Sequence, residues 1–66
     1  MLPGTWVAWV PARRAERNLH AEHSAWQVVR TDKAGNVLIV PVDRAGHQRW
    51  ERRIWIGAAQ VITSAS

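Results

Sequence analysis

Arginine and tryptophan are the residues of this chain whose types and spacing are best suited to chemistry. Residues 49–55 hold three arginines and two tryptophans, and a second arginine cluster consists of Arg13, Arg14 and Arg17. Indole rings stack on nucleic-acid bases and guanidinium groups neutralise phosphates, so this combination is typical of surfaces that bind single strands or structured RNA. The alternative is that the tryptophans form the core and the arginines a solvated surface.

A second group of interest surrounds two histidines. In a helix, Glu16 and His20 would share a face and His23 would follow one turn later, with Glu22 nearby, and such a cluster suits a zinc ion. In a loop the same residues would be exposed, titratable side chains. The second interpretation is favoured because metal sites usually fix their ligands on rigid elements, so we expect no metal site.

Catalysis has little support in the sequence. No arrangement of Ser, His and Asp stands out, there is no glycine-rich phosphate loop, and the five carboxylates are scattered over different segments. We therefore expect no catalytic residues and no cofactor, and we predict that the protein is not an enzyme.

Size and charge limit the possibilities further. The chain has 66 residues, which predicts a single domain, 1–66, with a small core. Nine Lys and Arg against five Asp and Glu give a net charge of +4, which favours an anionic partner, although a GC-rich genome would also supply the many arginines. There is no cysteine and no stretch approaching the ~20 apolar residues of a membrane span. We expect a cytoplasmic protein without a membrane partner.

The clearest structural signal is a repeated turn. The pattern Asp, cation, Ala, Gly, polar occurs at residues 32–36 and again at residues 43–47. In each copy the Asp side chain can accept hydrogen bonds from the turn, and Gly35 or Gly46 can take the positive φ that closes it. Because only one strand fits between the two turns, the repeat predicts two tight hairpins and a three-stranded meander.

The remaining elements follow from hydrophobic patterning. Strands are predicted at residues 5–10, 25–31, 37–42 and 48–56. Residues 58–63 are predicted to form a single 3₁₀ turn that leads into a short closing strand, and residues 64–66 a frayed tail. Residues 12–24 form either a long loop or a short helix with Ala15 and Leu19 facing inward. The loop is favoured, because Leu19 is the only large apolar residue in this stretch.

Alternation along the fourth predicted strand assigns its side chains to two faces. Trp50, Ile54 and Ile56 should face the core, whereas Arg49, Glu51 and Arg53 should face water. Applied to all five tryptophans, this reasoning predicts that Trp6, Trp26 and Trp50 are buried. It predicts that Trp9 and Trp55 are exposed.

The order of these elements resembles an SH3-like small barrel, with residues 3–7 as its opening and residues 55–61 as its final strand, turn and strand. The resemblance implies an all-β, five-stranded SH3-like barrel with a long first loop and two tight hairpins. In the SH3 domains of eukaryotic signalling proteins the first loop is acidic. Here it carries Arg13, Arg14 and Arg17, so the chain is more similar to bacterial, plasmid and phage members.

One enzyme family is also similar in part. Residues 25–27 and 54–59 resemble stretches of the type B dihydrofolate reductases, SH3-like chains that assemble a pore-shaped active site from four subunits. Their pore wall is a Val-Gln-Ile-Tyr strand. The matching residues here are Arg52, Arg53, Ile54 and Trp55, which lack the Gln and the Tyr, so this function ranks third.

Taken together, the sequence predicts a small, basic, non-enzymatic binding module that docks on DNA or RNA. The predicted binding surface consists of two arginine clusters and two exposed tryptophans: Arg13, Arg14, Arg17, Arg49, Arg53, Trp55 and Trp9. The alternative is a protein-interaction subunit of a homo-oligomer or of a larger phage or mobile-element assembly. In that case the exposed tryptophans would lie in a protein interface.

Overall fold

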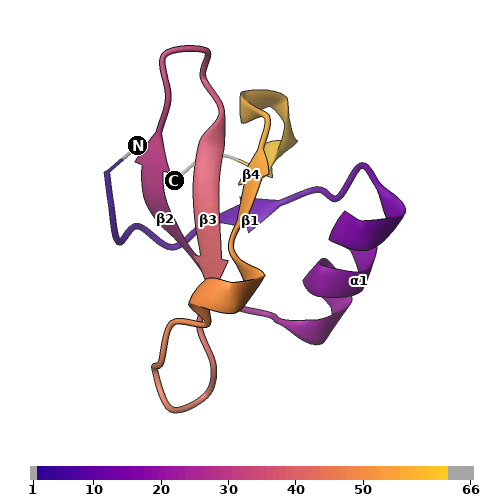
Figure 1. Ribbon diagram of the computed structural model, residues 1–66, viewed down its shortest axis with the longest axis vertical. Helices are drawn as coiled ribbons and strands as arrows, with labels where there is room; N and C mark the ends of the chain where they lie inside the picture. Colours follow the sequence, from indigo (N-terminus) through magenta and orange to yellow (C-terminus); the bar gives the residue numbers. More distant parts are fainter. Residues whose placement is uncertain (1, 63–66) are drawn as a thin grey trace.

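Two antiparallel sheets and one helix make up the computed structural model, which describes residues 2–62 (Figure 1). The first sheet has the order β2 (Trp26–Thr31), β3 (Val37–Pro41), β4 (Ile54–Ile56), and the second pairs β1 (Ala8–Trp9) with β5 (Val61–Ile62). The helix α1 (Arg14–Glu22) lies beside the first sheet, and the 3₁₀ turns are η1 (Trp50–Arg52) and η2 (Ala58–Gln60). The predicted tail at 64–66, and the last residue of the predicted closing strand, lie outside the described residues.

Both repeated turns are confirmed. Gly35 and Gly46 have φ of 87° and 85°, in the region that L side chains rarely adopt. The Asp32 carboxylate accepts hydrogen bonds from the backbone N–H of Ala34 and Asn36 and from the Asn36 side-chain amide. The Asp43 carboxylate accepts one from the backbone N–H of His47 at 2.9 Å. The predicted three-stranded meander is also confirmed, since β3 lies between β2 and β4.

Residues 14–22 form a helix, so the favoured loop interpretation was wrong. Tertiary contacts compensate for the missing apolar stripe. Leu19 packs against the core, and the Glu16 carboxylate accepts hydrogen bonds from the Ala12 N–H at 2.9 Å and from Gln60 Nε2 at 2.8 Å. Ala15, by contrast, is exposed. At nine residues α1 falls far short of a membrane span, and no other helical segment within residues 2–62 is long and apolar enough for one.

The core lies between the two sheets. Its buried members are Trp9, Trp26, Val28, Val37, Ile39 and Ile56. Trp26 is buried as predicted, and its ring meets that of Trp9 edge to face at 5.2 Å. Trp9 was predicted to be exposed, yet it is only 2% accessible, because it pairs with Val61 and both side chains turn toward the core. Trp6 has the opposite parity and is 60% exposed, so its predicted burial was also wrong.

The fourth predicted strand, 48–56, is interrupted. Val42 is bridged to Gln48, and Ile39 pairs with Ile54, so five residues of one strand face only two of the other. The additional residues of the longer strand leave the sheet and form the turn η1, in which the N–H of Arg52 donates to the carbonyl of Arg49. Ile56 is buried as predicted, but Trp50 is exposed because it belongs to this turn and not to a strand.

The strands do not close into a five-stranded barrel. Between β4 and β5 the chain turns at η2, where the Gln60 side chain accepts a hydrogen bond from the Gly57 N–H at 2.9 Å and donates one to the Val10 carbonyl at 3.0 Å. This turn leads the chain out of the first sheet and into the second. The predicted first strand is likewise shortened, since its early residues bond to β2 and only Ala8–Trp9 pair with β5. The architecture is mostly β, with one helix.

Candidate functional site

The outer surface of the first sheet carries a cation beside an aromatic ring. Leu38 on β3 pairs with Arg30 on one side and with Trp55 on the other, which places the three residues in one row across the sheet. The Arg30 guanidinium carbon lies 5.5 Å from the centre of the Trp55 ring, within cation–π range. Leu38 is buried beneath them, whereas Trp55 is 44% exposed. The indole is therefore held in place and still presents much of its surface to solvent.

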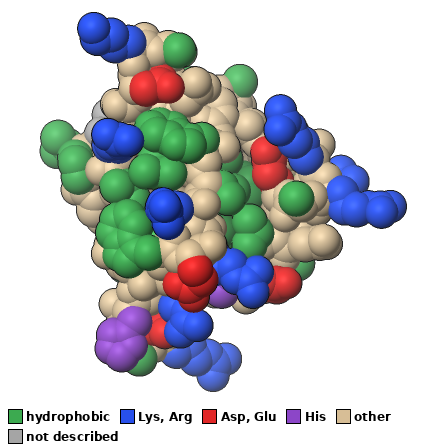
Figure 2. Space-filling view, viewed as in Figure 1, with side chains coloured by type: hydrophobic (Ala, Val, Ile, Leu, Met, Phe, Trp, Pro, Cys, Tyr) green, Lys and Arg blue, Asp and Glu red, His purple; other side chains and the backbone are tan. Residues whose placement is uncertain are grey.

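A second pair lies next to this row. The Arg53 Nη1 donates a hydrogen bond of 2.7 Å to the Trp50 carbonyl, and the Trp50 ring is 45% exposed. Arg53 precedes Trp55 by two residues and shares its side of the chain. Figure 2 shows large hydrophobic side chains on this surface with Lys and Arg side chains between them. We call Arg30, Trp50, Arg53 and Trp55 the Arg–Trp face.

The two arginines of this face have no carboxylate partner among residues 2–62, whereas their neighbours do. Arg49 lies 3.6 Å from Asp43 and 3.0 Å from Glu51, and Arg52 lies 3.5 Å from Glu22. The pKa of the Glu51 carboxyl is lowered, first by its own backbone N–H and then by Arg49. Positive charge on this side of the molecule is therefore concentrated at Arg30 and Arg53. The exposed ion pairs of Arg49 and Arg52 are weak, and phosphate groups can compete for them.

The other predicted cluster lies on a different element. Arg13 is the N-cap of α1, and Arg14 and Arg17 lie on the helix itself. A groove of about 380 Å³ separates α1 from η1 and β4, with Asn18 and Leu19 on one wall and Arg52, Arg53 and Ile54 on the other. No hydrogen bond or ion pair within the described part of the chain connects the helix arginines to the Arg–Trp face. The structure therefore brings Arg53 and Trp55 together, while Arg13, Arg14 and Arg17 lie on the far side of the groove.

Two further predicted site residues have another role. Trp9 belongs to the core and is only 2% accessible, so it is not part of an exposed arginine and tryptophan surface. Arg49 is exposed, but it precedes η1 and does not lie on a strand face as predicted, and its charge is shared with two carboxylates.

Arg30 and Trp50 were not among the predicted site residues. A bulge between Val28 and Arg30 adds one residue to β2, so that Arg30 turns to the outer surface and does not follow Trp26 and Val28 into the core. The sequence contains a signal for this bulge, because regular alternation would bury an arginine without a partner, which is energetically costly. For Trp50 no comparable signal exists, since the run 48–56 alternates as a strand does.

The histidine group does not converge. The His20 ring meets Trp9 at 5.1 Å, and the His23 ring meets Trp26 at 5.9 Å. Glu16 is bonded to Gln60, and Glu22 is paired with Arg52. Within residues 2–62 no three His, Asp or Glu side chains come close enough to hold a metal ion.

Hydrogen-bonding groups border the Arg–Trp face. The Gln48 amide donates to the Gln27 side-chain oxygen at 3.0 Å, and Gln27 pairs with Val40, whose side chain lies on the same surface as that of Leu38. The site thus combines aromatic rings, guanidinium groups and amides, which can stack on flat rings, neutralise phosphates and bond to polar edges. Comparison of the chain with protein-family models, curated proteins and solved structures gave no match. Function is therefore inferred from the residues of this face.

Proposed function

We propose that the protein is a non-enzymatic module that binds DNA or RNA through the Arg–Trp face. The observation that carries the proposal is the row of Arg30, Leu38 and Trp55, in which a half-exposed indole rests on a buried leucine next to a cation without a carboxylate partner. An exposed aromatic ring that is fixed in position suits stacking on a base, because little conformational freedom is lost on binding.

The second indole and the second arginine extend the same chemistry. Trp50 and Trp55 offer two stacking surfaces, and Arg30 and Arg53 offer two guanidinium groups to the phosphates between the bases. A stacked base contributes about 1–3 kcal/mol in proteins of this kind, and phosphate contacts add a component that weakens with salt. The net charge of +4 favours approach of a polyanion.

The order of the elements supports an SH3-like origin for the fold. A meander of β2, β3 and β4 is followed by the single turn η2 and by β5, which pairs with β1. The early residues of the predicted first strand also bond to β2, so that the chain runs from one sheet into the other. We propose that the molecule is an open variant of that barrel.

The proposal is tested by fluorescence anisotropy with a labelled single-stranded oligonucleotide. The variants Arg30→Gln and Arg53→Gln each remove one unpaired charge from the face and should weaken binding. The matched control is Arg44→Gln in the second turn, which removes the same charge from an exposed residue that does not belong to the face. If Arg44→Gln weakens binding as much as the other two, net charge and not the Arg–Trp face is responsible.

Salt separates this function from the alternative of a protein-interaction subunit. Nucleic-acid binding that depends on phosphates should weaken steeply as the salt concentration rises, whereas an apolar protein interface should hardly respond. If the unmodified protein binds neither DNA nor RNA at low salt, the proposed function is wrong.

A further inference from the structure

Charge is distributed very unevenly along this chain. All nine basic and all five acidic residues lie between Arg13 and Arg53, and residues 1–12 and 54–66 contain none. The second sheet is built from these two uncharged segments, because β1 comes from the first and β5 from the last. The molecule therefore has one sheet whose own strands carry neither sign of charge.

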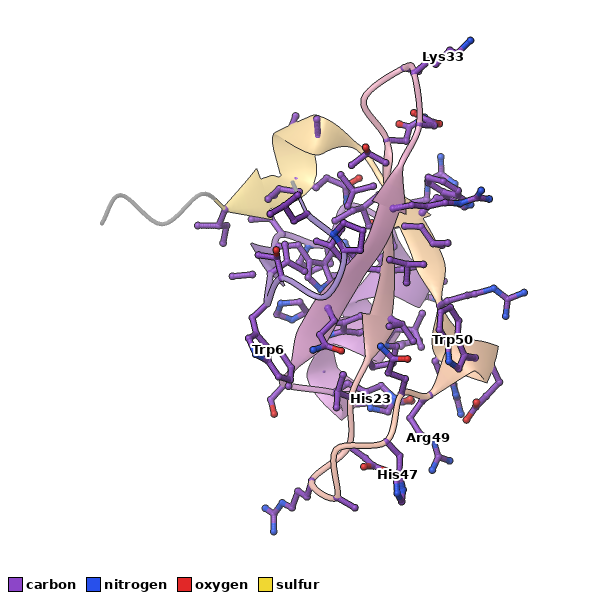
Figure 3. All side chains as sticks on the ribbon, turned by 90° about the vertical axis from the view of Figure 1, so that its left-hand side faces the viewer. Trp6, His23, Lys33, His47, Arg49 and Trp50 are labelled. Carbon is purple, nitrogen blue, oxygen red and sulfur yellow. The ribbon has the colours of Figure 1, made fainter. Side chains whose placement is uncertain are left out.

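The outward side of this sheet is apolar as well as uncharged. Val7 and Trp9 turn inward, so Trp6, Ala8 and Val10 share the outward side, and Ala8 pairs with Ile62. Val10 and Ile62 are 52% and 53% exposed. Trp6 lies where this sheet meets the first one, bridged to Gln27 of β2, and Figure 3 shows it well apart from Trp50. We call Trp6, Ala8, Val10 and Ile62 the uncharged face.

A hollow adjoins this face. It has a volume of about 330 Å³, and its lining includes Ala8 and Ile62 of the uncharged face together with Trp9, Trp26 and His20. Trp6, the most exposed indole of the described residues, lies two residues before Ala8. The uncharged face therefore includes an exposed aromatic side chain and borders a largely apolar hollow.

We propose that a second copy of this chain covers the uncharged face, forming a symmetric dimer in which Trp6 of each copy packs against the hollow of the other. A two-fold interface requires a surface that is complementary to itself, and a projection next to a hollow meets this requirement. Each copy carries a charge of +4, so two copies repel each other. This repulsion is weakest when they approach through strands that carry no charge. A standard protein–protein interface buries on the order of 800 Å² on each partner. This area is about one sixth of the 4817 Å² accessible surface of the chain.

The charge pattern also argues against other occupants. Acidic partners and anionic bilayers are attracted by Lys and Arg, and the strands of this face have neither. The dimer goes beyond the proposed nucleic-acid function and does not depend on it. It uses no residue of the Arg–Trp face, although Trp6 is bridged to Gln27, which borders that face.

The test is sedimentation velocity of the full chain over a range of concentrations up to about 200 µM, where dimers of micromolar affinity are well populated. We expect the mass to rise from 7.5 kDa to twice that value. Trp6→Glu and Ile62→Glu should each raise the concentration of half-dimerisation by at least about tenfold, since an isolated carboxylate would be buried. Trp50→Glu is the matched control, because it makes the same change in net charge at an exposed tryptophan outside the uncharged face.

Each outcome decides the proposal. Both Glu variants lower the net positive charge, so a loss of dimer cannot result from greater repulsion between copies. Circular dichroism establishes that each variant is folded, and having two variants keeps the test valid if one of them is not. A mass of 7.5 kDa for the unmodified chain at every concentration overturns the proposal. A dimer that withstands both substitutions, or that only Trp50→Glu disrupts, overturns it as well.

Discussion

The Arg–Trp face and the uncharged face both present exposed tryptophan, and they differ in what surrounds it. Trp55 has a guanidinium group 5.5 Å from its ring centre, whereas Trp6 lies in a segment of twelve residues without any charge. A cation beside an indole favours an anionic partner with flat rings, and an uncharged apolar surrounding favours another apolar surface. The two faces show that the neighbours of an exposed tryptophan, more than its exposure, indicate which partner it suits.

The largest expected effect comes from the tryptophan that supports both faces. Trp9→Ala should cost roughly 3–5 kcal/mol, which is comparable to the whole stability expected of so small a core. The variant should be unfolded at room temperature by circular dichroism, and both faces should be lost together. Trp6→Ala serves as the control and should remain folded. A cooperative melt of Trp9→Ala close to that of the unmodified protein would contradict the core described here.

A smaller effect should separate the two faces. Trp55→Ala should weaken binding to a single-stranded oligonucleotide by roughly 1–3 kcal/mol, because one stacking surface is removed. It should leave the sedimentation behaviour unchanged. Trp6→Ala should do the reverse, with weaker self-association and unchanged oligonucleotide affinity. If either variant impairs both properties while still folded, the two faces do not act independently.

The turn that joins β2 to β3 connects the two strands that carry Arg30 and Leu38. Gly35→Ala should destabilise the fold by about 1–2 kcal/mol, since φ of 87° is strained for any residue with a Cβ atom. Gly57→Ala is a suitable control because Gly57 has φ of −74°. Thermal melting of the two variants gives the comparison, and equal melting temperatures would argue against the turn geometry.

Acid should destabilise the two turns that contain Asp32 and Asp43. Hydrogen bonds from Asn36 lower the pKa of Asp32, and the His47 N–H lowers that of Asp43. Because each pKa is lower in the folded state, the stabilisation is complete above the ordinary value of 3.8 and is lost as the pH falls through the lowered value. Asp32→Asn should reduce this acid sensitivity in melts between neutral pH and about pH 2. An unchanged pH profile would contradict the role of Asp32.

Local chemistry was predictable from the sequence, and long-range pairing was not. The two turns are specified by an Asp and a Gly within five residues, so they could be located correctly. The side of the sheet on which Trp9 lies depends on β5, more than fifty residues away, and that of Trp6 depends on its bridge to Gln27 of β2. Since residues 5–10 are apolar on both sides, no alternation distinguished the inward side from the outward one.

The candidate site was predictable only in part, for related reasons. Arg53 and Trp55 were identified from a pattern that β4 preserves. Arg30 was missed because of the bulge, and Trp50 was assigned to the core because η1 replaces a regular strand. The placements of Arg30 and Trp50 both depend on how many residues of one strand face the neighbouring strand. Strand pairing decides this number, and local propensity does not.

The pairing of β1 with β5 also has a consequence for the order in which the molecule folds. Thr31 and Val37 pair across six positions, whereas Ala8 and Ile62 pair across fifty-four. Closing the longer loop costs more entropy and is slower, so the meander that carries the Arg–Trp face should form first and the second sheet last. Until that final step, Trp9 and the apolar residues around it are open to solvent and to other chains. The same segments that form the uncharged face are thus the ones most prone to aggregation during synthesis.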